Sequence, residues 1–401
     1  MSPRITAGID VGSRTIRVAI AREREKSSGL HIIGMGSAES RGIRKGYVVH
    51  REEAARAIKE ALARAEKMAG VPVRRALVSL GGISLESAMS AGSVMISRID
   101  GKVADMDIDR AMEIAESNIN LTNKKIIHSF PIRFRLDNKD VLGRPQGMQG
   151  GKLEVRMLFI TSAHQHLEDI IAAVENAGVD VGDIVASPLA ASVVTLSKAQ
   201  RTAGCVLANI GAETVSVAVF EDEQLVSLEV LPIGSSRITN DIALGLKIPL
   251  EEAEALKTGM IRTASIEFPQ RRLEEIVEAR LKDIFELVQI HLKKIGRNEL
   301  LPAGIILTGG GLGAEAIESI ARASLALPAR IAVLQSVALP ARSSDVHEGP
   351  SLDTAWSVAC GLCLLGGGGL YSSDFFEFNR VHVKVQKRLS GAVEWLKQFM
   401  P

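Results

Sequence analysis

The sequence predicts an α/β protein made of two similar halves that face each other across a cleft. One observation is an internal repeat: DVGSRTIRVAI starts at residue 10, and NIGAETVSVAVF starts at residue 209, about half of the 401-residue chain later. A second is that each copy reads as strand, glycine turn and strand, followed by further strands and helices in a similar order. A duplication of this kind favours two α/β halves around one cleft.

The elements of the first half come in the order βββαβ. The stretch Ile5–Ala21 predicts two strands joined by a glycine turn, and Leu30–Met35 predicts a third strand. Glu52–Ala69 is expected to be a helix, because its apolar residues recur at helical spacing. Ala76–Leu80 is expected to be a short apolar strand.

The second half repeats this order with more helices. We expect strands at Val206–Ile210, Val215–Phe220, Leu225–Leu231 and Ile305–Leu307, and helices at Ser236–Leu244, Leu250–Thr258 and Arg271–Ile295. Between the halves, Glu86–Ile160 has alternating strands and few helices, with the main helix near Asp107–Ile119. This pattern indicates a small inserted α+β subdomain.

The composition excludes some classes of function. A net charge of +1 and an aromatic content of 3% argue against a nucleic-acid partner. Cys205, Cys360 and Cys363 make no disulfide framework, which favours a reducing cytoplasm; Cys360 and Cys363 are expected to be packed helix residues rather than a metal site. The N-terminus reads straight into a strand rather than as a signal peptide. The uncharged run Thr354–Ser373 indicates a buried helix and a glycine loop rather than a membrane span.

The first glycine turn has the features of an anion site. Gly12 in a tight hairpin lets backbone N–H groups converge, and Ser13 and Thr15 can add hydroxyl donors. Asp10, at the end of a strand, suits Mg²⁺ held through water. One such hairpin could be an ordinary turn, but two in register can grip a phosphate chain from both sides.

Two further motifs could add contacts to a ligand. Gly304–Gly313 is a strand and a triglycine turn before an expected helix at Ala314–Ala323, and it offers bare backbone to a ligand. Its spacing fits a Rossmann site poorly, and packing alone is another reason for such glycines. Glu254 and Lys257 lie one helical turn apart, where they could bond ribose hydroxyls or simply pair with each other in water.

In this order and spacing, the hairpins DVGSRT and NIGAET, the AEALK helix and the LTGGG turn resemble the actin-like ATPase superfamily. The stretches IIGMGSAESRGIRKGYVV, LPIGSSRITNDIALGLKIPLEEAEALKTG and LPAGIILTGGG, with the inserted subdomain, resemble the bacterial cell-division FtsA family over nearly the whole chain. The resemblance implies an actin-like fold of two duplicated ribonuclease-H-like lobes around a nucleotide cleft. It divides the chain into subdomains IA (1–84 and 167–200), IC (85–166), IIA (201–233 and 303–376) and IIB (234–302), with 377–401 a linker and an amphipathic helix.

The resemblance also implies that ATP and Mg²⁺ occupy the cleft. One side of the phosphates would be held by Asp10, Gly12, Ser13, Arg14 and Thr15, and the other side by Gly211, Ala212, Glu213, Thr214 and Gly234. The ribose would meet Glu254 and Lys257, and the adenosine would meet Gly309, Gly310 and Gly311. Mg²⁺ would bind Asp10 through water, with Asn209 as a weaker ligand.

Three positions depart from the hydrolytic members of the superfamily. Asn209 stands where those members carry an aspartate, and an amide is a poorer Mg²⁺ ligand and no base. Ala212 replaces a glycine, and Ser187 precedes Pro188 where vigorous ATPases place a glutamate. We therefore expect the protein to retain bound nucleotide and to hydrolyse it slowly or not at all, and we assign no catalytic residue. The alternative is that these positions changed neutrally because hydrolysis depends on other groups.

The C-terminal segment is expected to form an amphipathic helix. Its apolar residues are Leu389, Val393, Leu396 and Met400 on one face, with Trp395 and Phe399 beside them. With the basic residues around it, such a helix suits a membrane surface, although it could instead dock on the protein's own core. The resemblance favours the membrane, because the FtsA family ends in such a helix.

The resemblance further implies partners and a location. The family tethers filaments of the tubulin-like protein FtsZ to the cytoplasmic side of the cell membrane at the septum, as a peripheral membrane protein. It binds the acidic C-terminal tail of FtsZ, self-associates into actin-like filaments and helps to recruit later division proteins. Arg280 and Lys293, on the expected long helix, are the candidates for contact with that tail, although a solvated helix face explains them equally well. The alternatives are a PilM-like scaffold of pilus assembly, which lacks the terminal helix, and a sugar or acetate kinase, which no motif supports.

Overall fold

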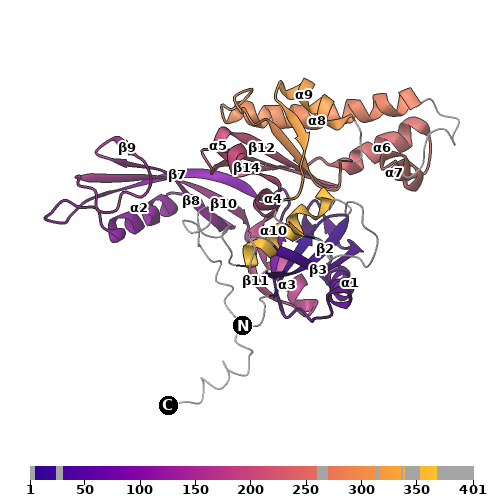
Figure 1. The fold of residues 1–401 in the computed structure, drawn as a ribbon, viewed down its shortest axis with the longest axis horizontal. Helices are drawn as coiled ribbons and strands as arrows, with labels where there is room; N and C mark the ends of the chain where they lie inside the picture. Colours follow the sequence, from indigo (N-terminus) through magenta and orange to yellow (C-terminus); the bar gives the residue numbers. More distant parts are fainter. Residues whose placement is uncertain are drawn as a thin grey trace, which may run out of the picture.

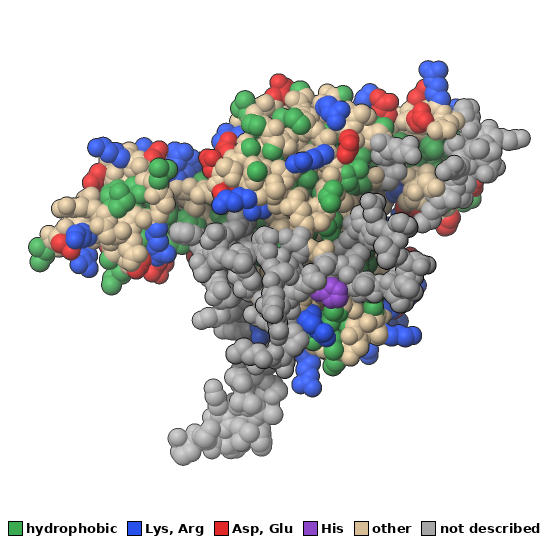
Figure 2. All heavy atoms as spheres, in the orientation of Figure 1, with side chains coloured by type: hydrophobic (Ala, Val, Ile, Leu, Met, Phe, Trp, Pro, Cys, Tyr) green, Lys and Arg blue, Asp and Glu red, His purple; other side chains and the backbone are tan. Residues whose placement is uncertain are grey.

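The structure, a computed structural model, describes residues 5–23, 30–259, 270–312, 316–335, 337–338 and 353–367. Two α/β lobes lie one above the other in Figure 1, with helices between them, and an arm of strands extends to the left. Both charge signs are spread over the arm and the upper lobe in Figure 2. Within the described residues, no helix combines the length and the apolar content needed to cross a bilayer.

The first lobe is built on a six-stranded sheet. In sheet order its strands are β11 (Asp180–Ala186), β6 (Arg75–Leu80), β1 (Ile5–Val11), β2 (Thr15–Glu23), β3 (Leu30–Glu39) and β17 (Val337–Ala338). The helices α1 (Arg51–Ala69) and α3 (His164–Asn176) pack on this lobe, and a short hairpin joins β4 (Ile43–Arg44) to β5 (Tyr47–Val48). The predicted strands and helix of the first half are therefore confirmed, within a few residues at their ends.

Glycines let helices lie directly on both faces of this sheet. On one face, a Cβ on Gly36 would come within 2.1 Å of the Ala61 carbonyl oxygen of α1. On the other face, a Cβ on Gly8 would come within 2.5 Å of the Ala359 carbonyl oxygen, in α10 (Ser357–Gly366). No side chain fits at either position, which explains why glycines interrupt these apolar strands.

The second lobe repeats the topology of the first. In sheet order its strands are β16 (Ala329–Ile331), β15 (Ile305–Thr308), β12 (Cys205–Ile210), β13 (Val215–Glu221) and β14 (Gln224–Leu231). As in the first lobe, the first three strands along the chain are antiparallel neighbours and the two later strands add in parallel. The predicted duplication is thus confirmed at the level of strand order and direction.

The helices predicted for the second lobe lie close to their expected positions. They are α6 (Ser235–Leu246), α7 (Leu250–Lys257), α8 (Gln270–Lys294) and α9 (Ile317–Leu325), whereas α5 (Lys198–Ala203) was not predicted. The helix expected at Ala314–Ala323 is α9, which begins and ends later than predicted. The apolar side of α8 is buried against the lobe through Leu281, Phe285 and Val288.

The inserted subdomain forms the arm. It comprises β7 (Glu86–Met95), α2 (Asp105–Ser117), β8 (Lys124–Leu136), β9 (Lys139–Val141) and β10 (Lys152–Ala163), and it has its own apolar core. Its strands continue the sheet of the second lobe, because β7 pairs with β14 where Glu86 lies opposite Glu229. The Ser87 hydroxyl accepts a hydrogen bond from the Leu228 N–H at 3.0 Å and donates one to the Leu228 carbonyl oxygen at 2.8 Å. The sequence did not indicate this nine-stranded sheet.

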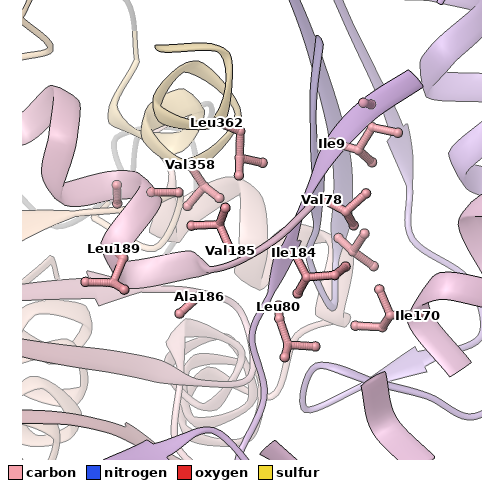
Figure 3. Packing of buried hydrophobic residues seen from close by; sticks show 14 of the residues in the cluster. Ile9, Val78, Leu80, Ile170, Ile184, Val185, Ala186, Leu189, Val358 and Leu362 are labelled. Atoms are coloured by element: carbon pink, nitrogen blue, oxygen red, sulfur yellow. The ribbon is translucent and has the colours of Figure 1, made fainter. Parts of the chain in front are cut away.

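Two central helices connect the lobes. α4 (Ser187–Thr195) packs against α10, and side chains of both helices meet those of β1, β6 and β11 in the apolar cluster of Figure 3. The prediction placed α10 in subdomain IIA (303–376), whereas its strand contacts in the described chain are mainly with the first lobe.

The two cysteines of the CxxC are buried in α10, as predicted for packed helix residues. The Cys363 thiol donates to the Ala19 carbonyl oxygen at 3.2 Å. Burial raises the pKa of this thiol to about 12, so it stays protonated at neutral pH.

We expect Gly36→Ala to lower the free energy of unfolding by about 1–3 kcal/mol, because the new methyl group would overlap the α1 backbone. Thermal and urea unfolding measure the change. Gly151→Ala is the matched control, since the nearest atom to a Cβ there lies 3.4 Å away. Equal stability of the two variants would contradict this account of the sheet–helix contact.

Candidate functional site

A cleft of about 220 Å³ lies between the lobes, where the two glycine hairpins face each other. The predicted site residues that line it are Asp10, Gly12, Ser13, Arg14, Thr15, Asn209, Gly211, Ala212, Thr214, Glu254, Gly309 and Gly310. Residues nearly two hundred positions apart in the chain therefore converge on one cavity, as the repeat predicted.

The two hairpins have the same local geometry. Val11 pairs with Ile16 and Ile210 pairs with Val215, so each turn spans four residues. A Cβ on Gly12 would lie 2.6 Å from the Thr15 carbonyl oxygen, and the equivalent distance from Gly211 to the Thr214 oxygen is 3.0 Å. A Cβ would overlap the backbone at Gly12 and would make a tight contact at Gly211, so the same point of each turn favours glycine.

Asp10 is held at the floor of the cleft by neighbouring polar groups. The Ser79 hydroxyl donates to Asp10 Oδ1 at 2.9 Å and accepts from the Val11 N–H at 3.0 Å. Burial raises the pKa of the Asp10 carboxyl, although the Arg17 guanidinium and the Ser79 hydroxyl partly oppose this rise. A carboxylate in such a place is stabilised by a nearby cation, so Asp10 fits the predicted contact with hydrated Mg²⁺.

The triglycine turn packs against the second hairpin. A Cβ on Gly309 would lie 2.5 Å from Asn209 Oδ1, and Gly309 has a φ of +105°, which favours glycine. The Gly311 N–H donates to the Ile210 carbonyl oxygen at 2.9 Å, behind the cavity wall. The turn therefore supports the Asn209 strand end as well as offering Gly309 and Gly310 to the cleft.

Glu254 and Lys257 form an ion pair of 2.7 Å at the side of the cleft. Lys257 is only 7% exposed, so this is not the solvated pair considered as an alternative. Burial would raise the pKa of the Glu254 carboxyl, but hydrogen bonds from Lys257, Thr239 and Arg14 hold it below its ordinary value. Burial also lowers the pKa of the Lys257 ammonium, against the opposing effect of Glu254.

Two ion pairs connect the lobes across the cleft. Arg14 of the first hairpin contacts Glu254 at 2.8 Å. Glu213 of the second hairpin accepts from the Lys45 N–H at 2.5 Å and from Arg44 at 3.2 Å. Glu213 therefore lines the neighbouring hollow beside Arg44 rather than the cavity between the hairpins.

Among the predicted residues, Glu213, Gly234, Lys257 and Gly311 do not line the cavity. Gly234 caps α6 and lies against the second hairpin, where its Cβ would come within 2.5 Å of the Ala212 carbonyl oxygen. The α6 N–H groups of Ser235 and Ser236 donate to the carbonyl oxygens of Gly211 and Ala212, at 2.9 and 2.8 Å. This helix end thus positions the hairpin.

Sequence analysis missed several residues that line the cavity. They are Val11, Arg17, Gly46, Ser79, Gly81, Gly82, Ser216, Ser235, Ala355 and Val358. Arg17 pairs with Asp10 across the hairpin, and its guanidinium lies 5.9 Å from the centre of the Trp356 ring. An arginine within the apolar strand IRVAIA was a usable signal, whereas the loops of Gly46 and Gly82 reach the site only through the fold.

The predicted partner residues have different positions. Arg280 of α8 pairs with Asp241 of α6 at 2.6 Å and with Asp283 at 3.0 Å, whereas Lys293 is exposed. The predicted membrane residues from Leu389 to Met400 lie outside the described residues.

The site offers backbone N–H groups, hydroxyls and Arg17 for an anion, and one carboxylate for a hydrated cation. In the described part of the chain, no group of three or more His, Cys, Asp or Glu residues gathers as a metal cage.

Family models match two parts of the chain. The family described as cell division protein FtsA matches residues 206–357. The SHS2 domain inserted in FtsA matches residues 82–161.

Two solved structures are similar over most of the chain. The PilM–PilN type IV pilus biogenesis complex has a TM-score of 0.66 at 16% identity and covers 90% of this chain and 98% of its own. The ethanolamine utilization protein EutJ from Carboxydothermus hydrogenoformans has a TM-score of 0.53 at 15% identity and covers 91% and 90%. At this identity they show the fold, which is the predicted actin-like arrangement of two lobes with an inserted domain.

Curated relatives are similar over most of their length. The cell division protein FtsA of Pseudomonas aeruginosa is 30% identical and covers 93% of this chain and 94% of its own length. That of Bacillus subtilis is 32% identical over 81% of this chain and 77% of its own. The chain belongs to the FtsA family of cell division proteins.

Proposed function

We propose that this cell division protein holds ATP with Mg²⁺ in the cleft and uses that state to tether FtsZ filaments to the membrane. One observation carries the nucleotide part. Two equivalent glycine hairpins, one from each lobe, turn their backbones toward the same cavity. A chain of phosphates is the ligand that such a pair of cradles suits.

The residues of the first lobe would hold one side of the phosphates. Gly12, Ser13 and Thr15 offer N–H and hydroxyl donors, and Arg17 adds a positive charge beside them. Asp10 would orient water on Mg²⁺, which would neutralise phosphate charge. Gly211, Ala212 and Thr214 would hold the opposite side, with Glu254 at the ribose and Gly309 and Gly310 at the adenosine.

We further propose that the nucleotide is held more than it is hydrolysed. Asn209 and Ser187 both line the cavity. At the two positions where hydrolytic members of the superfamily are expected to carry acids, this chain therefore presents neutral side chains to the cavity. Ala212 adds a methyl group in the same wall. A water molecule near the phosphates would lack a base at either position.

The tether would use two other parts of the chain. The exposed basic residues of α8, such as Lys293, would attract the acidic FtsZ tail, while Arg280 would exchange or share its contacts with Asp241. The C-terminal segment 389–401 would bind the membrane surface reversibly, and self-association into filaments would strengthen this binding through avidity. Later division proteins would bind the inserted arm.

The pilus-assembly alternative shares the fold, whereas the relatives at about 30% identity are cell division proteins.

We expect Asp10→Asn to weaken Mg²⁺·ATP binding at least about tenfold, because the amide orients Mg²⁺-bound water poorly. In the nucleotide-free protein the same change should raise the melting temperature by roughly 1–3 °C at neutral pH. Because the pKa of Asp10 is higher in the folded protein than in the unfolded chain, ionisation of this carboxyl lowers the free energy of unfolding as the pH rises through the folded-state pKa. Below the ordinary aspartate pKa the carboxyl is protonated in both states, and this loss of stability is absent.

Titration calorimetry with Mg²⁺ or EDTA measures the affinity, and unfolding at acidic and neutral pH measures the stability. Asp109→Asn, at an exposed position of α2, is the matched control for the loss of one charge. Unchanged Mg²⁺·ATP affinity in Asp10→Asn would rule out the metal contact.

Asn209→Asp should accelerate ATP cleavage at least about tenfold, because it restores a carboxylate that can place metal and water. Asn209→Ala should bring no such gain. Single-turnover release of labelled phosphate measures the rate. The proposal of a retained nucleotide fails if the unaltered chain cleaves ATP briskly and Asp10→Ala abolishes that cleavage.

Removal of residues 389–401 should abolish co-pelleting with anionic liposomes in ATP while leaving binding of a synthetic FtsZ tail peptide intact. Lys293→Glu should do the reverse, with several-fold weaker peptide capture, since a rim charge mainly affects encounter with an acidic partner. Co-sedimentation with labelled peptide reports both ends of the tether. Vesicle binding that survives the truncation would contradict the assignment of membrane binding to residues 389–401, and a full chain that binds no vesicles would favour the pilus-type scaffold.

A further inference from the structure

A buried histidine outside the predicted site lies next to the cleft. His166, in α3, is 2% exposed and stacks on Tyr47 with ring centres 4.4 Å apart. Its Nε2 lies 2.9 Å from the Gly46 carbonyl oxygen, which can only accept, so this nitrogen carries a hydrogen. Burial lowers the pKa of the imidazole, which leaves Nδ1 free to accept from the Ser84 hydroxyl at 2.8 Å.

The backbone of Gly46 links His166 to the first hairpin, because its carbonyl oxygen bonds the imidazole and its N–H bonds Ser13. Its N–H donates to Ser13 Oγ at 2.9 Å. This bond uses one lone pair of the Ser13 oxygen and restricts rotation of the hydroxyl, while its hydrogen stays available to a ligand in the cavity that Ser13 and Gly46 both line. A fixed donor of this kind binds a phosphate oxygen better than a freely rotating one.

Two glycines make room for the histidine. A Cβ on Gly46 would lie 2.4 Å from the Gly82 Cα, and a Cβ on Gly82 would lie 2.9 Å from His166 Cε1. Both have a positive φ, of +83° and +89°. The backbone at Gly46 and Gly82 therefore adopts conformations that favour glycine, and these conformations leave the space that the imidazole fills.

On its other side, His166 contacts both connections to the inserted arm. Ser84 lies just before β7, where the chain enters the arm, and Ser162 lies at the end of β10, where it returns. Their hydroxyl oxygens are 2.9 Å apart, and Ser162 is fully buried. Since Ser84 gives its hydrogen to His166, the Ser162 hydroxyl donates to Ser84.

We propose that His166 is a positioning residue of the nucleotide site: it holds the backbone of Gly46, which in turn orients the Ser13 hydroxyl for a phosphate, and it anchors this arrangement to the base of the inserted arm. The inference rests on the proposed binding of ATP. It assigns the arm's attachment a role in nucleotide affinity, carried by the chain Ser162, Ser84, His166, Gly46 and Ser13.

The test compares ATP with AMP in calorimetry of the full chain. His166→Phe keeps the ring on Tyr47 but loses both hydrogen bonds, and it should weaken ATP binding about three- to tenfold while AMP binding changes less than twofold. His166→Gln, which can still donate to Gly46, should restore most of the affinity. Ser84→Ala should shift ATP affinity in the same direction by a smaller factor. His164→Gln, at an exposed position of the same helix, is the control.

A double-mutant cycle separates positioning from general damage. In a Ser13→Ala background, His166→Phe should cause no further loss of ATP affinity, because the group that it positions is gone. A loss that persists there, or equal losses for ATP and AMP, would overturn the proposal. If circular dichroism shows that His166→Phe does not fold, Ser84→Ala replaces it in the cycle and is measured both in the unaltered chain and in the Ser13→Ala variant. An unaltered chain that binds no ATP defeats the proposed function, whereas normal ATP binding by all these variants defeats only this inference.

Discussion

The contact between α4 and α10 sets the geometry on which the rest of the structure depends. A Cβ on Gly361 would lie 1.8 Å from the Ala190 carbonyl oxygen, so the two helices touch through bare backbone. α4 packs on strands of both lobes, and α10 packs on the first. Their N-terminal ends supply Ser187 and Val358 to the cleft. The spacing of the two hairpins is therefore fixed by a contact that tolerates no added atom.

At the cleft between the lobes, a few polar groups each hold two parts of the site in place. Ser79 both ends the β1 ladder and orients Asp10, while the start of α6 holds the second hairpin from behind. The ion pairs of Arg14 with Glu254 and of Arg44 with Glu213 join the lobes at the rim. Both pairs are partly exposed, so each contributes little energy and can rearrange around a ligand. The cleft thus combines a rigid floor with an adjustable rim.

The inserted arm is attached to both lobes through different chemistry. Its β7 strand continues the sheet of the second lobe through the Glu86–Glu229 pair and the Ser87 hydroxyl. Its base contacts the first lobe through Ser84 and Ser162, which meet His166. This arrangement makes the arm a structural neighbour of the nucleotide site rather than an independent appendage.

The sequence by itself determined the repeat, the strands and helices, and most of the cavity wall, because glycine turns, apolar periodicity and the Asp10 motif are local signals. It also indicated Asn209 and Ser187 as neutral positions, and both line the cavity. Only the tertiary structure decided that α10 packs on the first lobe, that the arm extends the second sheet, and that Lys257 is buried behind Glu254. It alone brought Arg17, Gly46 and Gly82 to the cleft. The physical reason is that periodicity shows which side of an element is apolar, whereas its partner is selected by close backbone contacts between segments far apart in the chain.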